Sequence, residues 1–188
     1  MKGKISQIIY HYPSFLLDPP IRWHETFKNI PVTYEEGLPD DADYWSSIPK
    51  NSLVVIDDLW SQAAENDHIC MAFKCFSRHK HYNIIIISQN YFDRGRNSVS
   101  IRNNLNIIVL FENSSNRDVN KKIARSLGYL SEYKLAKKRF ESKPFSHIMF
   151  YVSPDVEKQF RVVSNLFGKN HPFFPIFHLS HSLQTYLK

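Results

Sequence analysis

Short, continuous runs of apolar residues recur along the sequence, and they constrain the fold more than any other feature. Three of the runs are rich in Val and Ile and do not alternate with polar residues, which is typical of strands buried on both faces of a parallel sheet. The runs are Ile5–Tyr12, Leu53–Ile56, Ile84–Ile87, Ile107–Phe111 and Ile148–Val152. We therefore expect the sheet to draw its strands from most of the chain.

Helical patterns lie between these runs. From Ile69 to Phe76, apolar residues fall on one face of a helix, and a second pattern with four-residue spacing ends at Gly128, which suits the position just after a helix. A third, Lys-rich helix is predicted over Ser131–Phe140. Strands that alternate with helices predict βαβ units, so we expect a three-layer α/β fold with a mostly parallel sheet.

The overall composition describes an ordinary globular protein with a basic surface. The 188 residues carry a formal net charge of +6, which favours acidic partners, nucleic acid first, although a Lys-rich soluble surface explains the charge equally well. The two cysteines, Cys70 and Cys75, are expected to be reduced thiols of an intracellular compartment. The sequence has no apolar run long enough to span a membrane.

Paired carboxylates follow the second apolar run. In Leu53–Asp58, four apolar residues lead into Asp57 and Asp58, so both acids are expected at the C-terminal end of a buried strand, where ligands of open α/β sheets bind. One carboxylate can hold Mg²⁺, and the other can orient and deprotonate an attacking water. This is the Walker B arrangement. The alternative is a strand that ends in a polar turn, with one Asp capping the next helix.

An amide follows the next run in the same way. The strand Ile84–Ile87 leads into Ser88, Gln89 and Asn90. An amide both donates and accepts hydrogen bonds, so it can bridge a γ-phosphate and a water, as at the sensor position of nucleotide hydrolases. Strands often end in Gln or Asn, but two polar endings separated by one amphipathic helix are more specific.

Basic residues follow the amide. An Arg that projects from a loop, in the sequence Arg94-Gly95-Arg96 or at Arg102, can stabilise charge on a transferring phosphoryl group. The alternative is a basic loop that contacts solvent or DNA phosphates, and both interpretations can hold together. The candidate DNA contacts are Arg94, Arg96, Lys137, Lys138 and Arg139.

The order of these motifs resembles the packaging ATPases of the FtsK–HerA superfamily, especially those of poxvirus-like large DNA viruses, adintoviruses and Polinton/Maverick elements. The family segment Ser-His-His-x-Asn is similar to Ser77 to Asn83, and its Gln-Asn pair matches Gln89 and Asn90. The following Arg and Asn of the family match Arg102 and Asn104, although some relatives carry the Arg nearer to the position of Val99. The resemblance covers Ile5 to Val152 and is strongest from Leu53 to Asn113.

The resemblance implies a P-loop NTPase fold of the ASCE type and ATP-driven packaging of double-stranded DNA by a homo-oligomeric ring that works with a capsid or portal-like protein. It implies ATP and Mg²⁺ as cofactors, with Asp57 as the Mg²⁺ ligand, Asp58 as the base, Gln89 as the γ-phosphate sensor and Arg102 as a residue that acts across the subunit boundary or as a second sensor. It places the protein in a viral factory or in the host cytoplasm or nucleus, without a membrane.

One family motif is missing. With five scattered glycines, the sequence has no G-x-x-x-x-G-K-[ST] segment to cradle phosphates. We therefore expect an ATPase-like core over residues 1–153 that lacks the first strand and its loop, followed by an aromatic tail over residues 154–188. Two alternatives remain: a degenerate, non-hydrolysing descendant that still assembles or binds DNA, and an unrelated basic α/β binding domain.

Overall fold

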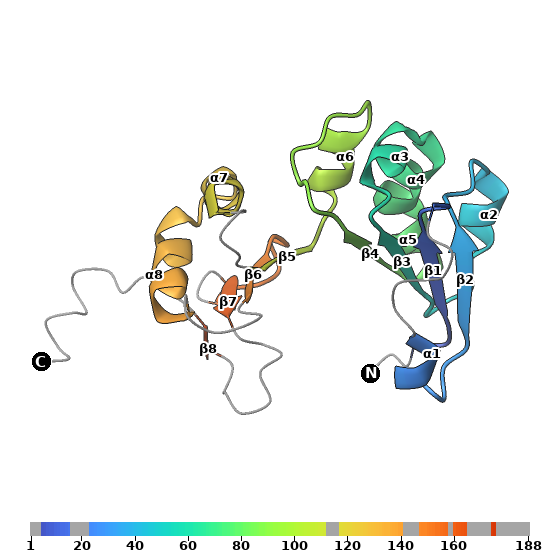
Figure 1. Ribbon diagram of the computed structural model, residues 1–188, viewed down its shortest axis with the longest axis horizontal. Helices are drawn as coiled ribbons and strands as arrows, with labels where there is room; N and C mark the ends of the chain where they lie inside the picture. The colour runs from blue at the N-terminus through green and yellow to red at the C-terminus, as the bar shows by residue number, and fades with distance from the viewer. Residues whose placement is uncertain are drawn as a thin grey trace, which may run out of the picture. The chain divides into compact units, whose positions relative to one another are not determined.

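The computed structural model describes residues 5–15, 23–111, 117–140, 147–157, 160–164 and 174–175. The chain divides into two compact units, Met1–Asn104 and Leu105–Lys188, and each unit has its own sheet (Figure 1). The proposed division into a core of residues 1–153 and a tail of residues 154–188 stays a prediction, because most of the tail lies outside the described residues.

A four-stranded parallel sheet forms the centre of the first unit. Its strands are β1 (Ile8–Tyr12), β2 (Val32–Glu36), β3 (Leu53–Asp57) and β4 (Asn83–Ile87). Their order across the sheet is β2-β1-β3-β4, and every neighbouring pair is parallel. The expected α/β architecture with a parallel sheet is therefore confirmed for this unit.

The helices of the first unit are short and follow the strands. They are α1 (Trp23–Thr26), α2 (Ala42–Ser47), α3 (Trp60–Glu65), α4 (Asp67–Met71), the π-helical turn η1 (Ala72–Phe76), α5 (Ser77–Lys80) and α6 (Ser98–Asn103). The segment from α4 to α5 begins where Asn66 accepts the backbone N–H groups of His68 and Ile69. It ends at His81, which adopts the left-handed conformation typical of a helix end.

Both faces of the sheet are buried at its centre. On one face, Tyr10 and Val55 belong to an apolar cluster that continues into β2, and both side chains are fully buried. On the other face, the buried His11 packs against Trp45 of α2, with ring centroids 5.6 Å apart. Each Val, Leu or Ile side chain buried in this way contributes about 1.5–3 kcal/mol to stability, so the continuous apolar runs stabilise the sheet.

The outer strand β4 is less buried than its neighbours. It ends the sheet, and its residues alternate between exposed and half-buried, with Ile85 43% and Ile87 39% exposed. The expectation of burial on both faces is therefore wrong for this run, because a strand at the edge of the sheet is covered less than a central one. None of its five residues is charged. An uncharged edge strand is unusual, because most proteins protect such edges with charge or Pro.

The second unit contains an antiparallel sheet, which corrects the expectation of a mostly parallel one. Its strands are β5 (Ile107–Phe111), β6 (His147–Tyr151), β7 (Val162–Ser164) and β8 (Phe174–Pro175), paired in that order. Two helices, α7 (Arg117–Ser126) and α8 (Leu130–Phe140), separate β5 from β6. With two helices between them, β5 and β6 pair as antiparallel neighbours, whereas the pattern of alternating strands and helices predicts parallel pairing.

The predicted helix end at Gly128 is confirmed. Gly128 has a φ of +80°, its N–H donates to Arg125 O at 3.1 Å, and the N–H of Tyr129 donates to Ala124 O at 2.9 Å. These are the two bonds of a Schellman motif, in which glycine takes the left-handed position without steric cost.

If the strand of the phosphate-binding loop is missing from between them, Ile84–Ile87 and Ile107–Phe111 are expected either to be direct neighbours or to flank an open groove. The expectation of direct pairing is wrong. Among the described pairings, β4 pairs only with β3, and β5 pairs only with β6, so each ends a separate sheet. The alternative expectation, that the two strands flank an open groove, stays a prediction.

Candidate functional site

The acidic and amide endings of β3 and β4 lie at the same edge of the sheet. Asp57 is opposite Ile87 in the parallel register, and the N–H of Asp58 donates to Ile87 O at 3.1 Å. Ser88 and Gln89 directly follow Ile87. The expectation that these strand ends lie side by side is therefore confirmed. Of the three side chains expected to meet there, Asp58 and Gln89 share one pocket and Asp57 does not line it, and their chemical roles stay predictions.

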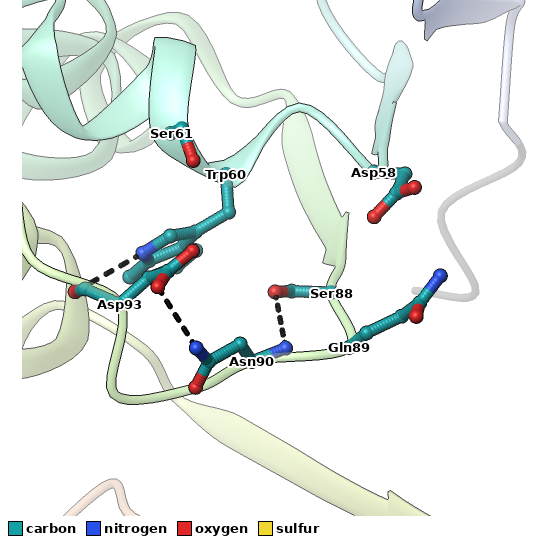
Figure 2. A pocket seen from close by; sticks show the side chains of 7 residues that line it. All are labelled: Asp58, Trp60, Ser61, Ser88, Gln89, Asn90 and Asp93. Carbon is teal, nitrogen blue, oxygen red and sulfur yellow. Dashed lines mark hydrogen bonds between the residues drawn. The ribbon is translucent and has the colours of Figure 1, made fainter.

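Asp58 and Gln89 share an open pocket of about 180 Å³. Figure 2 shows the seven side chains that line it: Asp58, Trp60, Ser61, Ser88, Gln89, Asn90 and Asp93. Two carboxylates, two amides and two hydroxyls surround one indole, and among the residues that the structure describes no Lys or Arg side chain lines the pocket. Such a lining suits a cation or a neutral polar group better than a bare anion.

The backbone at Asp58 is held in a rare conformation. Its φ of +52° lies in the left-handed region, which costs free energy for any residue with a Cβ, although Asp and Asn tolerate it better than most. The turn is needed because the chain must leave β3 and enter α3, which begins at Trp60. An acid at a position where glycine fits more easily is a reason to look for a function.

Asp57 does not line the pocket, because its carboxylate is bonded within the sheet. The hydroxyl of Tyr10, on the neighbouring strand β1, donates a hydrogen bond to Asp57 Oδ2. Tyr10 is fully buried, and this burial, together with the Asp57 carboxylate, raises the pKa of the phenol well above its ordinary value. One carboxylate oxygen of Asp57 is therefore bonded to Tyr10, and the other can bind a ligand.

The loop after β4 is built from local hydrogen bonds. The N–H of Asn90 donates to Ser88 Oγ at 3.1 Å, and the amide oxygen of Asn90 accepts the N–H of Phe92 at 3.2 Å. Asn90 Nδ2 donates to Asp93 Oδ1 at 2.8 Å, as the dashed lines of Figure 2 show. The Asn90 and Asp93 side chains thus reach the pocket as a bonded pair.

Arg102 lies in the helix α6 and not in a projecting loop as expected, and it does not line the pocket but contacts the loop that does. Its guanidinium donates to the backbone oxygens of Tyr91 at 3.1 Å and Asp93 at 3.4 Å. The same group lies over the Tyr91 ring, 5.6 Å from its centroid. Burial raises the pKa of Tyr91, and the nearby positive charge of Arg102 opposes that shift. The predicted role of Arg102 across a subunit boundary stays a prediction.

The basic loop around Gly95 is docked against α3 and α4. The Arg96 guanidinium lies 3.0 Å from the Asp67 carboxylate and donates to Glu65 O at 2.8 Å, while the Arg96 N–H donates to Glu65 Oε1 at 3.1 Å. These contacts give Arg96 a structural role, which competes with its predicted role in DNA binding. Arg94 is exposed.

The other predicted DNA contacts lie on α8 in the second unit. Lys138 is exposed and Lys137 is half-buried, while the side chain of Arg139 lies outside the described residues. On the adjoining α7, Lys121 and Lys122 are exposed. The two helices therefore present lysines of the kind that contact nucleic-acid phosphates.

The end of β3 offers a small number of oxygen ligands for Mg²⁺. One or two carboxylates suffice for this ion, which keeps several of its waters, so Asp57 and Asp58 fit it by type. In the part of the chain that the structure describes, no group of three or more His, Cys, Asp or Glu side chains is arranged to hold a metal. Within the same residues, no helix is long and apolar enough to cross a bilayer.

No family model, curated protein or solved structure matches the chain.

Sequence reasoning missed part of the pocket. Ser88 and Asn90 belong to the quoted motif, but Trp60, Ser61 and Asp93 gave no signal, because their position depends on how the loop folds back. The bond between Tyr10 and Asp57 was equally hidden, since it depends on the register between β1 and β3.

Proposed function

We propose that this chain is a subunit of a nucleotide-driven DNA-translocating motor of the FtsK–HerA type, with its nucleotide site at the C-terminal edge of β3 and β4. The observation that carries the proposal is the pairing of a strand that ends in two carboxylates with a parallel neighbour that ends in an amide, around one pocket. The resemblance in motif order, from Leu53 to Asn113, supports the same site.

Each side chain has a distinct task in this proposal. Asp58 in the pocket, with the carboxylate oxygen of Asp57 that Tyr10 leaves free, would hold Mg²⁺, which would supply positive charge to neutralise the nucleotide phosphates. Asp58, which faces the pocket, also accepts a proton from the attacking water. Gln89 contacts the terminal phosphate and that water through its amide.

The sheet order supports the proposal further. In this ATPase class, the strand that carries the phosphate-binding loop lies beside the sensor strand. Here the sensor position follows β4, whose outer edge is uncharged and partly exposed. This edge is where such a strand would pair.

The absent G-x-x-x-x-G-K-[ST] segment limits what the chain does alone. The backbone N–H groups and the Lys of that loop form the main cradle for the β- and γ-phosphates. The 188 residues contain no such segment, so we expect a nucleotide dissociation constant of about 1 mM, equivalent to only about −4 kcal/mol, and no appreciable turnover.

The test is the binding of a fluorescent ATP analogue with and without Mg²⁺. With Mg²⁺, Asp58→Asn and Gln89→Ala should each weaken binding, whereas Asp40→Asn, at an 82% exposed side chain, should not. Without Mg²⁺, Asp58→Asn should strengthen binding, because it removes a negative charge near a polyanion. Equal affinities for all variants in both conditions would reject the site.

The second candidate function is a non-hydrolysing module that binds nucleic acid or assembles with a partner. The observation that favours it is that, in the described part of the chain, the pocket lining contains no basic side chain. Under this alternative, DNA binding is present, and neither Mg²⁺-nucleotide nor Asp58→Asn changes it.

A further inference from the structure

The loop from Asn90 to Asp93 depends on contacts made from outside it. Asn90 and Asp93, at the two ends of the loop, both line the pocket. The loop backbone must be fixed for both side chains to point into the pocket. Two side chains from other elements reach the Asp93 carbonyl: Arg102 of α6 at 3.4 Å, and the indole N–H of Trp60 in α3 at 3.5 Å.

Arg102 is suited to fix this backbone. A guanidinium presents several N–H donors in a rigid plane, so one side chain can bond two carbonyls and still lie over an aromatic ring. Arg102 does this with Tyr91 O, Asp93 O and the Tyr91 ring. The side chain is half-buried, so these bonds are less screened by water than bonds at the surface.

We propose that Arg102 is a positioning residue that acts within its own chain, and that it fixes the loop so that Asn90 and Asp93 form one wall of the pocket. This role differs from that of an Arg that reaches into a neighbouring subunit, because the guanidinium is bonded to its own polypeptide. The inference takes the pocket as the ligand site and in that respect rests on the proposed function.

The fluorescence of Trp60 reports whether the loop forms this wall of the pocket. Its indole lines the pocket and is only 4% exposed, so its emission and its quenching by iodide report whether the loop covers it. Because the chain has three Trp residues, the Trp60 signal is taken as the difference between each protein and its Trp60→Phe counterpart.

The experiment compares Arg102→Ala and Arg102→Lys with Arg78→Ala. Arg78 is the matched control, because it bonds Asn104 Oδ1 at 2.9 Å, just past the end of α6, and not the loop. We expect Arg102→Ala to shift Trp60 emission to the red and to increase quenching, Arg102→Lys to show a partial effect, and Arg78→Ala to show none. Millimolar guanidinium ion, too dilute to unfold the protein, should restore the Trp60 signal of Arg102→Ala.

Varying the protein concentration distinguishes an Arg102 that acts within its own chain from one that acts on a neighbouring subunit. If Arg102 acts within its own chain, the Trp60 signal of the unmodified protein is the same in dilute monomer and at high concentration. A signal that reverts on dilution to that of Arg102→Ala would overturn the proposal, as would an unchanged Trp60 signal in Arg102→Ala.

Binding of the fluorescent ATP analogue then tests whether the position of the loop affects the ligand site. With Mg²⁺, Arg102→Ala should weaken its binding about tenfold, and guanidinium should recover part of the loss. If the unmodified protein does not bind the analogue, the proposed function fails, while the Trp60 measurements still decide the role of Arg102.

Discussion

At the scale of single residues, Asp58 has a left-handed backbone conformation that is unfavourable for residues with a Cβ. With a φ of +52°, glycine would fit this turn with less strain, yet the chain places a carboxylate there, facing the pocket. Under the proposed function this carboxylate serves ligand binding, so it should contribute little to stability.

We predict that Asp58→Asn and Asp58→Gly change the free energy of unfolding by less than about 1 kcal/mol, because relief of strain offsets the added freedom of the unfolded chain. Asp58→Val should cost more than about 1–2 kcal/mol, since a β-branched side chain tolerates the left-handed region poorly. All three should weaken Mg²⁺-nucleotide binding. Urea unfolding measures the stabilities, and a large loss in Asp58→Gly would mean that the carboxylate is structural.

His11 is the other residue whose chemistry is set by its surroundings. Its Nδ1–H donates to Gly37 O at 3.0 Å, its Nε2 lies 3.2 Å from the Tyr44 hydroxyl, and that hydroxyl donates to Glu35 Oε2 at 2.7 Å. Burial lowers the pKa of His11 below its ordinary value of 6.5, while the Glu35 carboxylate and the Gly37 carbonyl oppose this shift.

This lowered pKa predicts acid sensitivity. Below about pH 6.5 the unfolded chain takes up a proton at His11 that the folded chain resists, so stability falls as the pH drops from the ordinary value toward the lowered one. Glu35→Gln should enlarge the loss, because it removes the charge that favours the imidazolium. Urea unfolding between pH 5 and pH 8 measures the effect. His11→Gln should flatten this pH dependence, whereas His79→Gln, at an exposed histidine, should leave it unchanged.

At the scale of elements, the close contact between the basic loop and α3 fixes the outer part of the site. A Cβ on Gly95 would lie 2.5 Å from Ala64 Cβ, which cannot move unless α3 moves. The loop therefore approaches the helix as closely as a backbone without a side chain permits.

We predict that Gly95→Ala lowers the free energy of unfolding by about 1–3 kcal/mol, the usual cost of overpacking. Adding Ala64→Gly makes room for the new methyl group, so the double variant should lose less than the sum of the two single losses. A double-mutant cycle by urea unfolding checks this. If the losses of the two single variants simply add in the double variant, the loop and α3 are not in close contact in solution.

At the scale of the whole molecule, the net charge of +6 and the exposed lysines of α7 and α8 predict DNA binding that is indifferent to sequence. Each phosphate contact makes the slope of log affinity against log salt steeper by about 0.9. Replacing Lys121 and Lys138 with Gln should therefore flatten the slope by about 1.8.

Titrations of unrelated duplexes at several salt concentrations measure this slope. Lys50→Gln, at an exposed lysine of the other unit, is the matched control and should change it little. A strong preference for one duplex, with little loss of affinity at high salt, would contradict the prediction.

The sequence by itself determined the strands and the edge of the sheet that carries the site. A continuous apolar run such as Leu53–Ile56 favours burial on both faces, which β3 shows and the edge strand β4 does not. Parallel strands bring the acids at the end of β3 and the amide after β4 to one end of the sheet. The end of α7 was equally predictable, because Gly128 offers the left-handed turn that a helix end needs.

Tertiary structure alone decided the rest. The antiparallel direction of β6 against β5 was not predicted, because an apolar run has the same local pattern in either direction. The partner of Asp57 depended on the register between β1 and β3, and the contacts of Arg102 depended on where α6 meets the loop after β4. Local sequence sets which backbone states and which buried faces are favourable, but it does not set which distant side chains meet, because that follows from packing among elements far apart in the chain.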